Sequence, residues 1–203
     1  MLLSINPDNP QHRLLSQVVD LLQQGAVIAY PTDTVYGIGC DIYNQKAVKR
    51  VHGLKRRAPD KPFSFMCDSL KNVSTYCHVS NYAYRIMKRL LPGPYTFVLP
   101  AMKIVPKIMI SKQKTVGIRV PDNRICNQLV ELLGNPIVTT SAALGEEPTA
   151  TNLYDLEDRL SKLVDVIITD EGPLYSEPSS VVSLVDELPV VLRAGKGPVD
   201  QLL

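Results

Sequence analysis

The sequence lacks the features of a membrane-spanning or secreted chain. No apolar run approaches the roughly 18 residues that mark a transmembrane helix. The N-terminus, Met-Leu-Leu-Ser-Ile-Asn-Pro-Asp, has no basic region of the kind that begins a signal peptide. We therefore expect no membrane association and a cytoplasmic location.

Cysteine and histidine are too few and too scattered for a disulfide framework or a metal site. The chain has no Cys-x-x-Cys motif, and its three histidines show no ligand spacing. The four cysteines (Cys40, Cys67, Cys77 and Cys126) stand mostly among apolar neighbours. This pattern predicts reduced, buried thiols and no bound metal.

Two common nucleotide-binding motifs are also missing. Gly37 and Gly39 follow an expected strand, but the third glycine of a dinucleotide fingerprint is absent and no helix is expected to begin there. The chain contains no Gly-x-x-x-x-Gly-Lys-Ser/Thr segment. Any nucleotide site must therefore be built differently from a P-loop or a Rossmann turn.

The chain has the size and composition of one globular domain. Its 203 residues are 45% hydrophobic and 21% charged, with a net charge of +2. Apolar periodicity predicts helices near residues 14–22, 47–54 and 153–163, and further helices that begin at Asp68, Ser80 and Asp122. Expected strands cover residues 26–30, 63–67, 95–99, 115–120, 136–140, 164–169, 179–185 and 190–193. Alternating helices and strands favour an α/β fold with a mixed, twisted sheet, in a single domain spanning 1–203.

Several residues mark helix ends. Asn44, Asp68, Ser80 and Asp122 are typical N-caps, and Gly25 and Gly134 are typical stops.

The most unusual segment is Lys-Arg-Arg-Ala-Pro-Asp-Lys-Pro at residues 55–62, which places four cations within seven residues beside prolines. A Pro-bracketed loop can direct several cations at one anion. The segment therefore predicts a site for nucleotide phosphates or an RNA backbone. The alternative is a solvated basic turn.

Hydrogen-bond donors cluster at the expected strand ends, where ligands commonly bind in α/β sheets. These donors are Thr32, Thr34 and Tyr36; Lys55, Arg57 and Lys61; Arg119; Ser141; and Ser179, Ser180 and Arg193. No histidine stands where it could serve Ser141 as a base. Such a site suits binding and electrostatic stabilisation of phosphate and carboxylate. Alternatively, these residues serve turns, caps and a structural ion pair.

Ordered motifs along nearly the whole chain resemble the Sua5/YciO/YrdC family. The motifs are Pro-Thr-Asp-Thr-Val-Tyr-Gly-Ile-Gly at 31–39, Lys-Arg-Arg at 55–57, Pro-Gly-Pro-Tyr-Thr-Phe at 92–97, Thr-Val-Gly-Ile-Arg-Val-Pro at 115–121, Thr-Thr-Ser-Ala at 139–142, Glu-Pro-Ser-Ser-Val-Val at 177–182 and Leu-Arg-Ala-Gly at 192–195. The resemblance implies a YrdC-like twisted open sheet with flanking helices and a concave, positively charged face. It also implies a nucleotidyltransferase that converts L-threonine, bicarbonate and ATP into threonylcarbamoyl-AMP and pyrophosphate, for N6-threonylcarbamoyladenosine (t6A) in tRNA.

The resemblance assigns roles to individual residues. Lys55 and Arg57 would hold the ATP phosphates and, with Ser141, form the catalytic set. Ser141, Ser179 and Arg193 would bind the adenylate, and Thr34 and Arg119 would orient L-threonine. Mg²⁺ would accompany ATP without a dedicated protein site. The residues predicted to bind tRNA or other double-stranded RNA are the cationic Lys49, Arg50, Arg56 and Lys61.

One departure from the family pattern affects the nucleotide site. Ala143 stands where the family's Ser-x-Asn pair has asparagine, and a methyl group cannot replace an amide's donor and acceptor. The amino-acid sequence around residues 63–67, 95–99 and 189–197 resembles the YciO branch of the family more than the synthases. The sequence therefore leaves open a synthase-like enzyme, a double-stranded RNA-binding protein with little synthase activity, and a stable domain that has lost activity.

Overall fold

The computed structural model describes residues 1–55, 63–144, 149–150 and 152–202. Within these residues ten strands form one sheet, in the order β1-β8-β2-β3-β7-β4-β6-β5-β9-β10. The strands are β1 (Leu2–Ser4), β2 (Ile28–Tyr30), β3 (Gly37–Asp41), β4 (Ser64–Met66), β5 (Tyr95–Pro100), β6 (Thr115–Arg119), β7 (Ile137–Ser141), β8 (Val166–Thr169), β9 (Ser180–Ser183) and β10 (Val190–Arg193). The sheet contains both parallel and antiparallel pairs of neighbouring strands, which confirms the mixed α/β sheet expected from the sequence.

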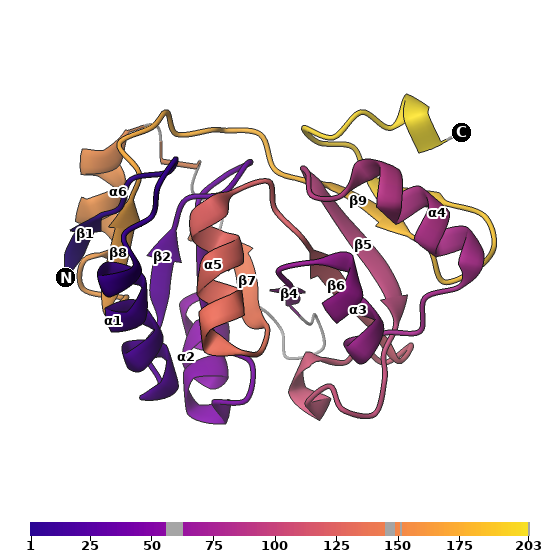
Figure 1. The fold of residues 1–203 in the computed structure, drawn as a ribbon, viewed down its shortest axis with the longest axis horizontal. Coiled ribbons are helices and arrows are strands. Elements are labelled where there is room, and N and C mark those ends of the chain that lie inside the picture. Colours follow the sequence, from indigo (N-terminus) through magenta and orange to yellow (C-terminus); the bar gives the residue numbers. More distant parts are fainter. Residues whose placement is uncertain (56–62, 145–148, 151, 203) are drawn as a thin grey trace.

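Helices flank this sheet (Figure 1). They are α1 (His12–Gln23), α2 (Gln45–Lys55), α3 (Leu70–Tyr76), α4 (Asn81–Leu90), α5 (Arg124–Leu133) and α6 (Leu153–Leu160), with short 3-10 turns at Lys107–Met109 and Asp200–Leu202. None of the helices in the described ranges has the length and apolar character to span a bilayer.

The core lies on both faces of the sheet. Neighbouring residues of a strand enter different apolar clusters, as Phe65 and Met66 of β4 do, because successive side chains of a strand point to opposite faces. α1 and α5 cover one cluster, whereas α2, α3, α4 and α6 supply the larger one. The four cysteines are buried free thiols, as the sequence predicts, and burial raises the pKa of Cys77 to about 12.

Most predicted helix ends are confirmed. Gly25 and Gly134 adopt positive φ angles of 95° and 77° just after α1 and α5. The Asn44 side chain accepts the Ala47 N–H at 3.0 Å, and Ser80 accepts the Ala83 N–H at 3.1 Å. These contacts satisfy amide groups that have no partner within the helix.

Two predicted N-caps are wrong by one residue. Ser69 occupies the N-cap position of α3, and Asp68 instead accepts hydrogen bonds from the side chains of Ser69 and Asn72. Asn123 caps α5 by accepting the Cys126 N–H at 3.0 Å, whereas the N–H of Asp122 donates to Asp33. An adjacent Asp-Ser or Asp-Asn pair offers two residue types that favour the N-cap position, and of the two that occupy it only Asn123 makes a side-chain capping hydrogen bond.

Strands β1 and β3 are absent from the sequence prediction. β3 contains two glycines, which disfavour a strand in sequence patterns. In the structure, a Cβ at Gly39 would lie 2.1 Å from the Val138 carbonyl oxygen, so the β3–β7 pairing requires glycine there. Close backbone approach, rather than strand propensity, explains the Gly-x-Gly segment.

Candidate functional site

A cavity of about 450 Å³ lies against the strands at the centre of the sheet. Its walls come from β4 to β7, the start of β9, Arg193 of β10 and the loop at residues 31–36, so segments from Val35 to Arg193 meet there. This volume falls within the range of small-molecule sites in proteins. The lining residues include Arg119 and Arg193 together with several hydroxyls, and no carboxylate is among those the structure describes. The cavity therefore suits an anionic ligand.

Arg119, at the end of β6, forms one corner of the cavity with the 31–36 loop. Its Nη2 donates to Asp33 Oδ1 at 2.8 Å and to Thr34 Oγ1 at 2.9 Å. Thr32 Oγ1 fixes this loop by accepting the Thr34 N–H at 3.0 Å. The Arg119 side chain is about nine-tenths buried. Its Nε is buried as well and has no hydrogen-bond partner among the described residues. A buried, unpaired donor beside a cavity is well placed to bind a ligand oxygen.

Lys55, the last residue of α2, is not among the residues that line the cavity, but it contacts Ser141 at the end of β7, which is one of them. Its Nζ donates to the Ser141 carbonyl at 2.9 Å and to Ser141 Oγ at 3.2 Å, and it also contacts the carbonyl oxygen of Ala143. The residue is 7% exposed. The Lys55 ammonium thus holds the segment after β7 beside the cavity.

Ser179 and Arg193 form another corner of the cavity. Arg193 Nη2 donates to the Ser179 carbonyl at 2.8 Å, and Ser179 Oγ lies 2.8 Å from Thr96 Oγ1 on β5. Ser179 and Thr96 are both buried. The arrangement brings a guanidinium group and two hydroxyls to one wall.

The cavity floor depends on close packing of small and hydroxyl side chains. A Cβ at Gly117 would lie 2.4 Å from Ser64 Oγ, so glycine on β6 leaves space for that hydroxyl. Thr139 Oγ1 accepts a hydrogen bond from the Tyr30 hydroxyl at 2.6 Å. Burial raises the pKa of the Tyr30 phenol well above its ordinary value.

The predicted site residues therefore meet as three pairs: Thr34 with Arg119, Lys55 with Ser141, and Ser179 with Arg193. Arg56, Arg57 and Lys61 lie outside the described residues.

The two described residues predicted to contact RNA are on α2, and neither lines the cavity. Lys49 is exposed. Arg50 donates to Asp165 Oδ2 at 2.5 Å and to the Leu163 carbonyl at 2.8 Å, so it also has a structural role.

Several residues in or beside the cavity escape sequence reasoning. Asp33 belongs to a recognised motif, but nothing local shows that it pairs with Arg119. Ser64, Thr96 and Thr139 lie inside strands, where alternation marks one face without showing that a cavity adjoins it. Gly117 is the strongest sequence signal for the cavity, because glycine inside a strand often marks a place where another group approaches the backbone closely.

The structure gives no sign of a protein-bound metal centre in the ranges it describes: no group of three or more His, Cys, Asp or Glu side chains is arranged to hold an ion. The Asp33 carboxylate, which lies beside the cavity, is engaged by Arg119. A cation that enters with a polyphosphate ligand would take most of its ligands from phosphate and water.

The fold and cavity define an open-sheet α/β protein with a pocket lined in part by guanidinium and hydroxyl groups. The family model for Sua5, YciO and YrdC, described as "Telomere recombination", matches residues 20–195. The chain belongs to this family.

Two curated relatives cover most of the chain. The uncharacterised protein YciO of Escherichia coli is 43% identical over 201 residues, which is 98% of this chain and 97% of YciO. The putative threonylcarbamoyl-AMP synthase of Methanocaldococcus jannaschii is 32% identical over 178 residues, 88% of this chain and 84% of the synthase. The chain is therefore a homologue of both YciO and the synthases.

Solved structures agree with the fold. The crystal structure of E. coli YciO superposes with a TM-score of 0.94 at 42% identity and covers 100% of this chain and 99% of that one. Sua5 of Pyrococcus abyssi, crystallised with L-threonine, gives a TM-score of 0.90 at 27% identity over 99% of this chain and 59% of Sua5. The open sheet with flanking helices is common to all three.

Proposed function

We propose that this chain is an ATP-dependent synthase that makes threonylcarbamoyl-AMP from L-threonine, bicarbonate and ATP and releases pyrophosphate, for t6A formation in tRNA. The observation that supports it most is that three donor pairs, from segments far apart in sequence, each contribute at least one residue to the lining of one cavity. The homologous synthases and the L-threonine complex of P. abyssi Sua5 support the same reaction class.

Arg119 and Thr34 are the proposed amino-acid end of the cavity. The Nη2 of Arg119 is engaged by Asp33 and Thr34, which fixes the guanidinium plane, and the buried Nε has no partner among the described residues. A carboxylate bound at Nε would form a charge-assisted hydrogen bond, which is stronger than a neutral one. The α-amino group of threonine would then point into the cavity, toward bicarbonate.

Adenylation of a carbamate needs alignment and charge neutralisation more than a protein nucleophile. The amine of threonine and bicarbonate form a carbamate with loss of water. A carbamate oxygen then attacks the α-phosphorus of ATP, and the bond to the β-phosphate bridging oxygen breaks as pyrophosphate leaves. In our proposal Lys55 and Arg57 neutralise the phosphates, while Ser141, Ser179 and Arg193 hold the adenylate. Mg²⁺ enters with ATP.

A pyrophosphate-release assay tests this proposal. We expect release to require L-threonine, bicarbonate and ATP together. Arg119→Gln should weaken the response to L-threonine by about 10- to 100-fold, since a hydrogen bond to a charged group contributes roughly 1.5–3 kcal/mol. Arg85→Gln, on the exposed surface of α4, is the control. Release that ignores threonine and bicarbonate, or equal behaviour of the two variants, would contradict the proposal.

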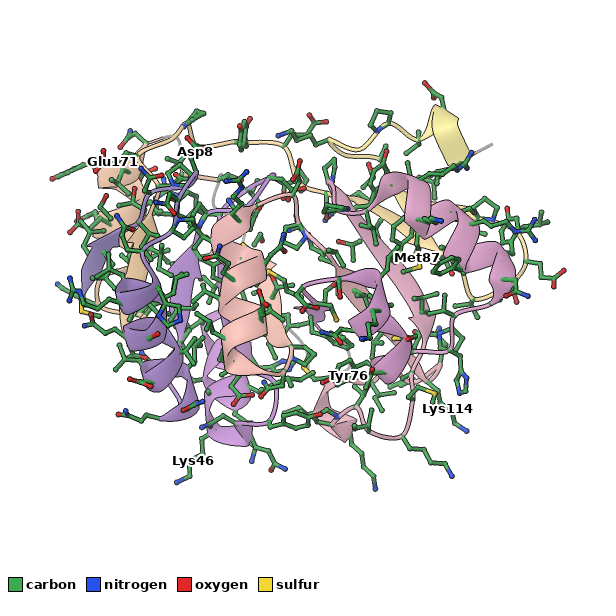
Figure 2. All side chains as sticks on the ribbon, viewed as in Figure 1. Asp8, Lys46, Tyr76, Met87, Lys114 and Glu171 are labelled. Atoms are coloured by element: carbon green, nitrogen blue, oxygen red, sulfur yellow. The ribbon has the colours of Figure 1, made fainter. Side chains whose placement is uncertain are left out.

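Exposed lysines favour RNA backbone binding as a second candidate function. Lys46 on α2 and Lys114 just before β6 extend from the same edge of the molecule (Figure 2), and Lys49, Lys103 and Lys107 are exposed nearby in sequence. Phosphate contacts without base readout would give sequence-independent affinity that falls steeply with salt. RNA binding with that salt dependence, in a protein that releases no pyrophosphate, would favour this function over synthesis.

A further inference from the structure

Residues 170–179, here called the strap, cross from one part of the sheet to another. They connect β8, the second strand of the sheet order, to β9, the ninth, and run along the upper edge in Figure 1. The strap has no helix or strand of its own, and most of its residues from Glu171 to Glu177 are exposed or half-buried. Its far end, Pro178 and Ser179, lines the cavity. Movement of the strap would therefore alter access to the site.

One side chain ties the strap to the opposite wall. Lys196 Nζ lies 3.6 Å from the centroid of the Tyr175 ring and donates to the Asp33 carbonyl oxygen at 2.5 Å. The ammonium group thus makes a cation–π contact with the strap and a hydrogen bond with the 31–36 loop. Asp33 and Lys196 are 163 residues apart in the chain.

The backbone that carries Lys196 is fixed independently of this side chain. The Lys196 N–H donates to the Pro178 carbonyl at 2.9 Å, and the Gly195 N–H donates to Ser180 Oγ at 2.9 Å. A Cβ at Gly195 would lie 2.3 Å from the Pro178 carbonyl oxygen, so the two segments are in close contact. Substitution of the Lys196 side chain can therefore remove its two contacts while Ser179 and Arg193 keep theirs.

Asp33 connects Lys196 to the amino-acid end of the cavity. Its carbonyl accepts from Lys196, and its carboxylate accepts from Arg119 Nη2 at 2.8 Å. We propose that Lys196 is a positioning residue that holds the strap against the 31–36 loop and, through Asp33, sets Arg119 for binding a carboxylate substrate. The part concerning substrate rests on the proposed function; the part concerning the strap does not.

A unique fluorophore tests the strap contact directly. The chain has no tryptophan, so Tyr175→Trp creates a single reporter whose indole can also form a cation–π contact. In this background we expect Lys196→Met to raise acrylamide quenching of the indole by about 3-fold. A cation–π contact at an exposed site changes the ratio of strap held against the lysine to strap released from it by a few-fold. Lys196→Arg should stay close to the parent, and Lys88→Met on α4 is the matched control. Equal quenching in the Lys196→Met and Lys88→Met proteins would show that Lys196 does not hold the strap.

Calorimetry separates the effect on substrate from the effect on the strap. Lys196→Met in the otherwise natural chain should weaken L-threonine binding about 5- to 10-fold, with ATP affinity within about 2-fold of the parent, because the backbone bonds at Pro178 and Ser180 persist. An unchanged threonine affinity would overturn the positioning role. If the natural chain bound no L-threonine, the proposed substrate would fail while the quenching experiment still decided the strap contact.

Discussion

Lys55 makes structural contacts at a position where the sequence predicts phosphate binding. The sequence places it in a basic segment that predicts phosphate binding, whereas in the structure its ammonium contacts carbonyl oxygens of Ser141 and Ala143. Those contacts involve the main chain of residue 143, so they do not depend on the asparagine that the family pattern expects there. Lys55 thus holds the main chain at residues 141 and 143 and also places positive charge beside it.

We predict that Lys55→Met weakens ATP binding by about 10-fold or more and lowers the free energy of unfolding by roughly 1–3 kcal/mol. Loss of the ammonium removes a charge-assisted donor from the carbonyl oxygens of the half-buried Ser141 and Ala143. Titration calorimetry and urea unfolding measure the two effects. Lys49→Met, on the exposed side of the same helix, provides the comparison. If both variants bound ATP equally well, Lys55 would have no role in nucleotide binding.

At the scale of elements, the pairing of β3 with β7 positions the central part of the site. β3 runs antiparallel to both β2 and β7, with Gly37 opposite Ser141 and Gly39 opposite Thr139. The strand thereby links the 31–36 loop to the strand that carries Ser141. Its glycines are required by close packing: Gly37 faces the Tyr30 ring, and Gly39 faces the Val138 carbonyl.

Two glycine substitutions should therefore have opposite signs. We predict that Gly39→Ala lowers the free energy of unfolding by about 2–3 kcal/mol, because its Cβ would lie 2.1 Å from a backbone oxygen that cannot move freely. Gly53→Ala on α2, where nothing lies within 4 Å of the new Cβ, should raise it by up to about 1 kcal/mol through helix propensity. Urea unfolding measures both. A Gly39→Ala protein as stable as the parent would show that β3 can shift away from β7.

At the scale of the whole molecule, Asp165 joins segments from three parts of the chain. Its carboxylate accepts from the Val27 N–H at 2.8 Å and from Arg50, and its carbonyl accepts from the N-terminal ammonium at 2.9 Å. Burial by itself would raise the pKa of this carboxyl, but the hydrogen bonds from Arg50 and Val27 outweigh it and lower the pKa below 3.8.

A lowered pKa in the folded state means that the ionised carboxylate stabilises the fold above the ordinary pKa. That contribution is lost as the pH falls through the folded-state value. Asp165→Asn should cost roughly 0.5–1 kcal/mol near pH 7, a small effect because Asp165 and Arg50 are about 40% exposed. The difference between the two proteins should shrink below about pH 4. Urea unfolding from pH 7 to pH 3 measures it, and a difference that grew on acidification would show the sign to be wrong.

The sequence by itself determined the features that depend on neighbours along the chain. Apolar periodicity located the helices, and Asn44, Ser80, Gly25 and Gly134 marked their ends, because caps act over three or four residues. The order of motifs indicated the family and the donor-rich loops. Local patterns placed each of these loops at a strand end, where side chains leave the sheet.

The tertiary structure alone decided which of those donors meet. Contacts such as Arg119 with Asp33 and Lys196 with Asp33 join residues far apart in the chain, and their formation depends on strand order and loop closure, which no local window encodes. β3 was missed for the same reason, since its glycines are explained by a backbone that approaches from β7. Local chemistry thus specifies the parts of this site, and long-range packing specifies their arrangement.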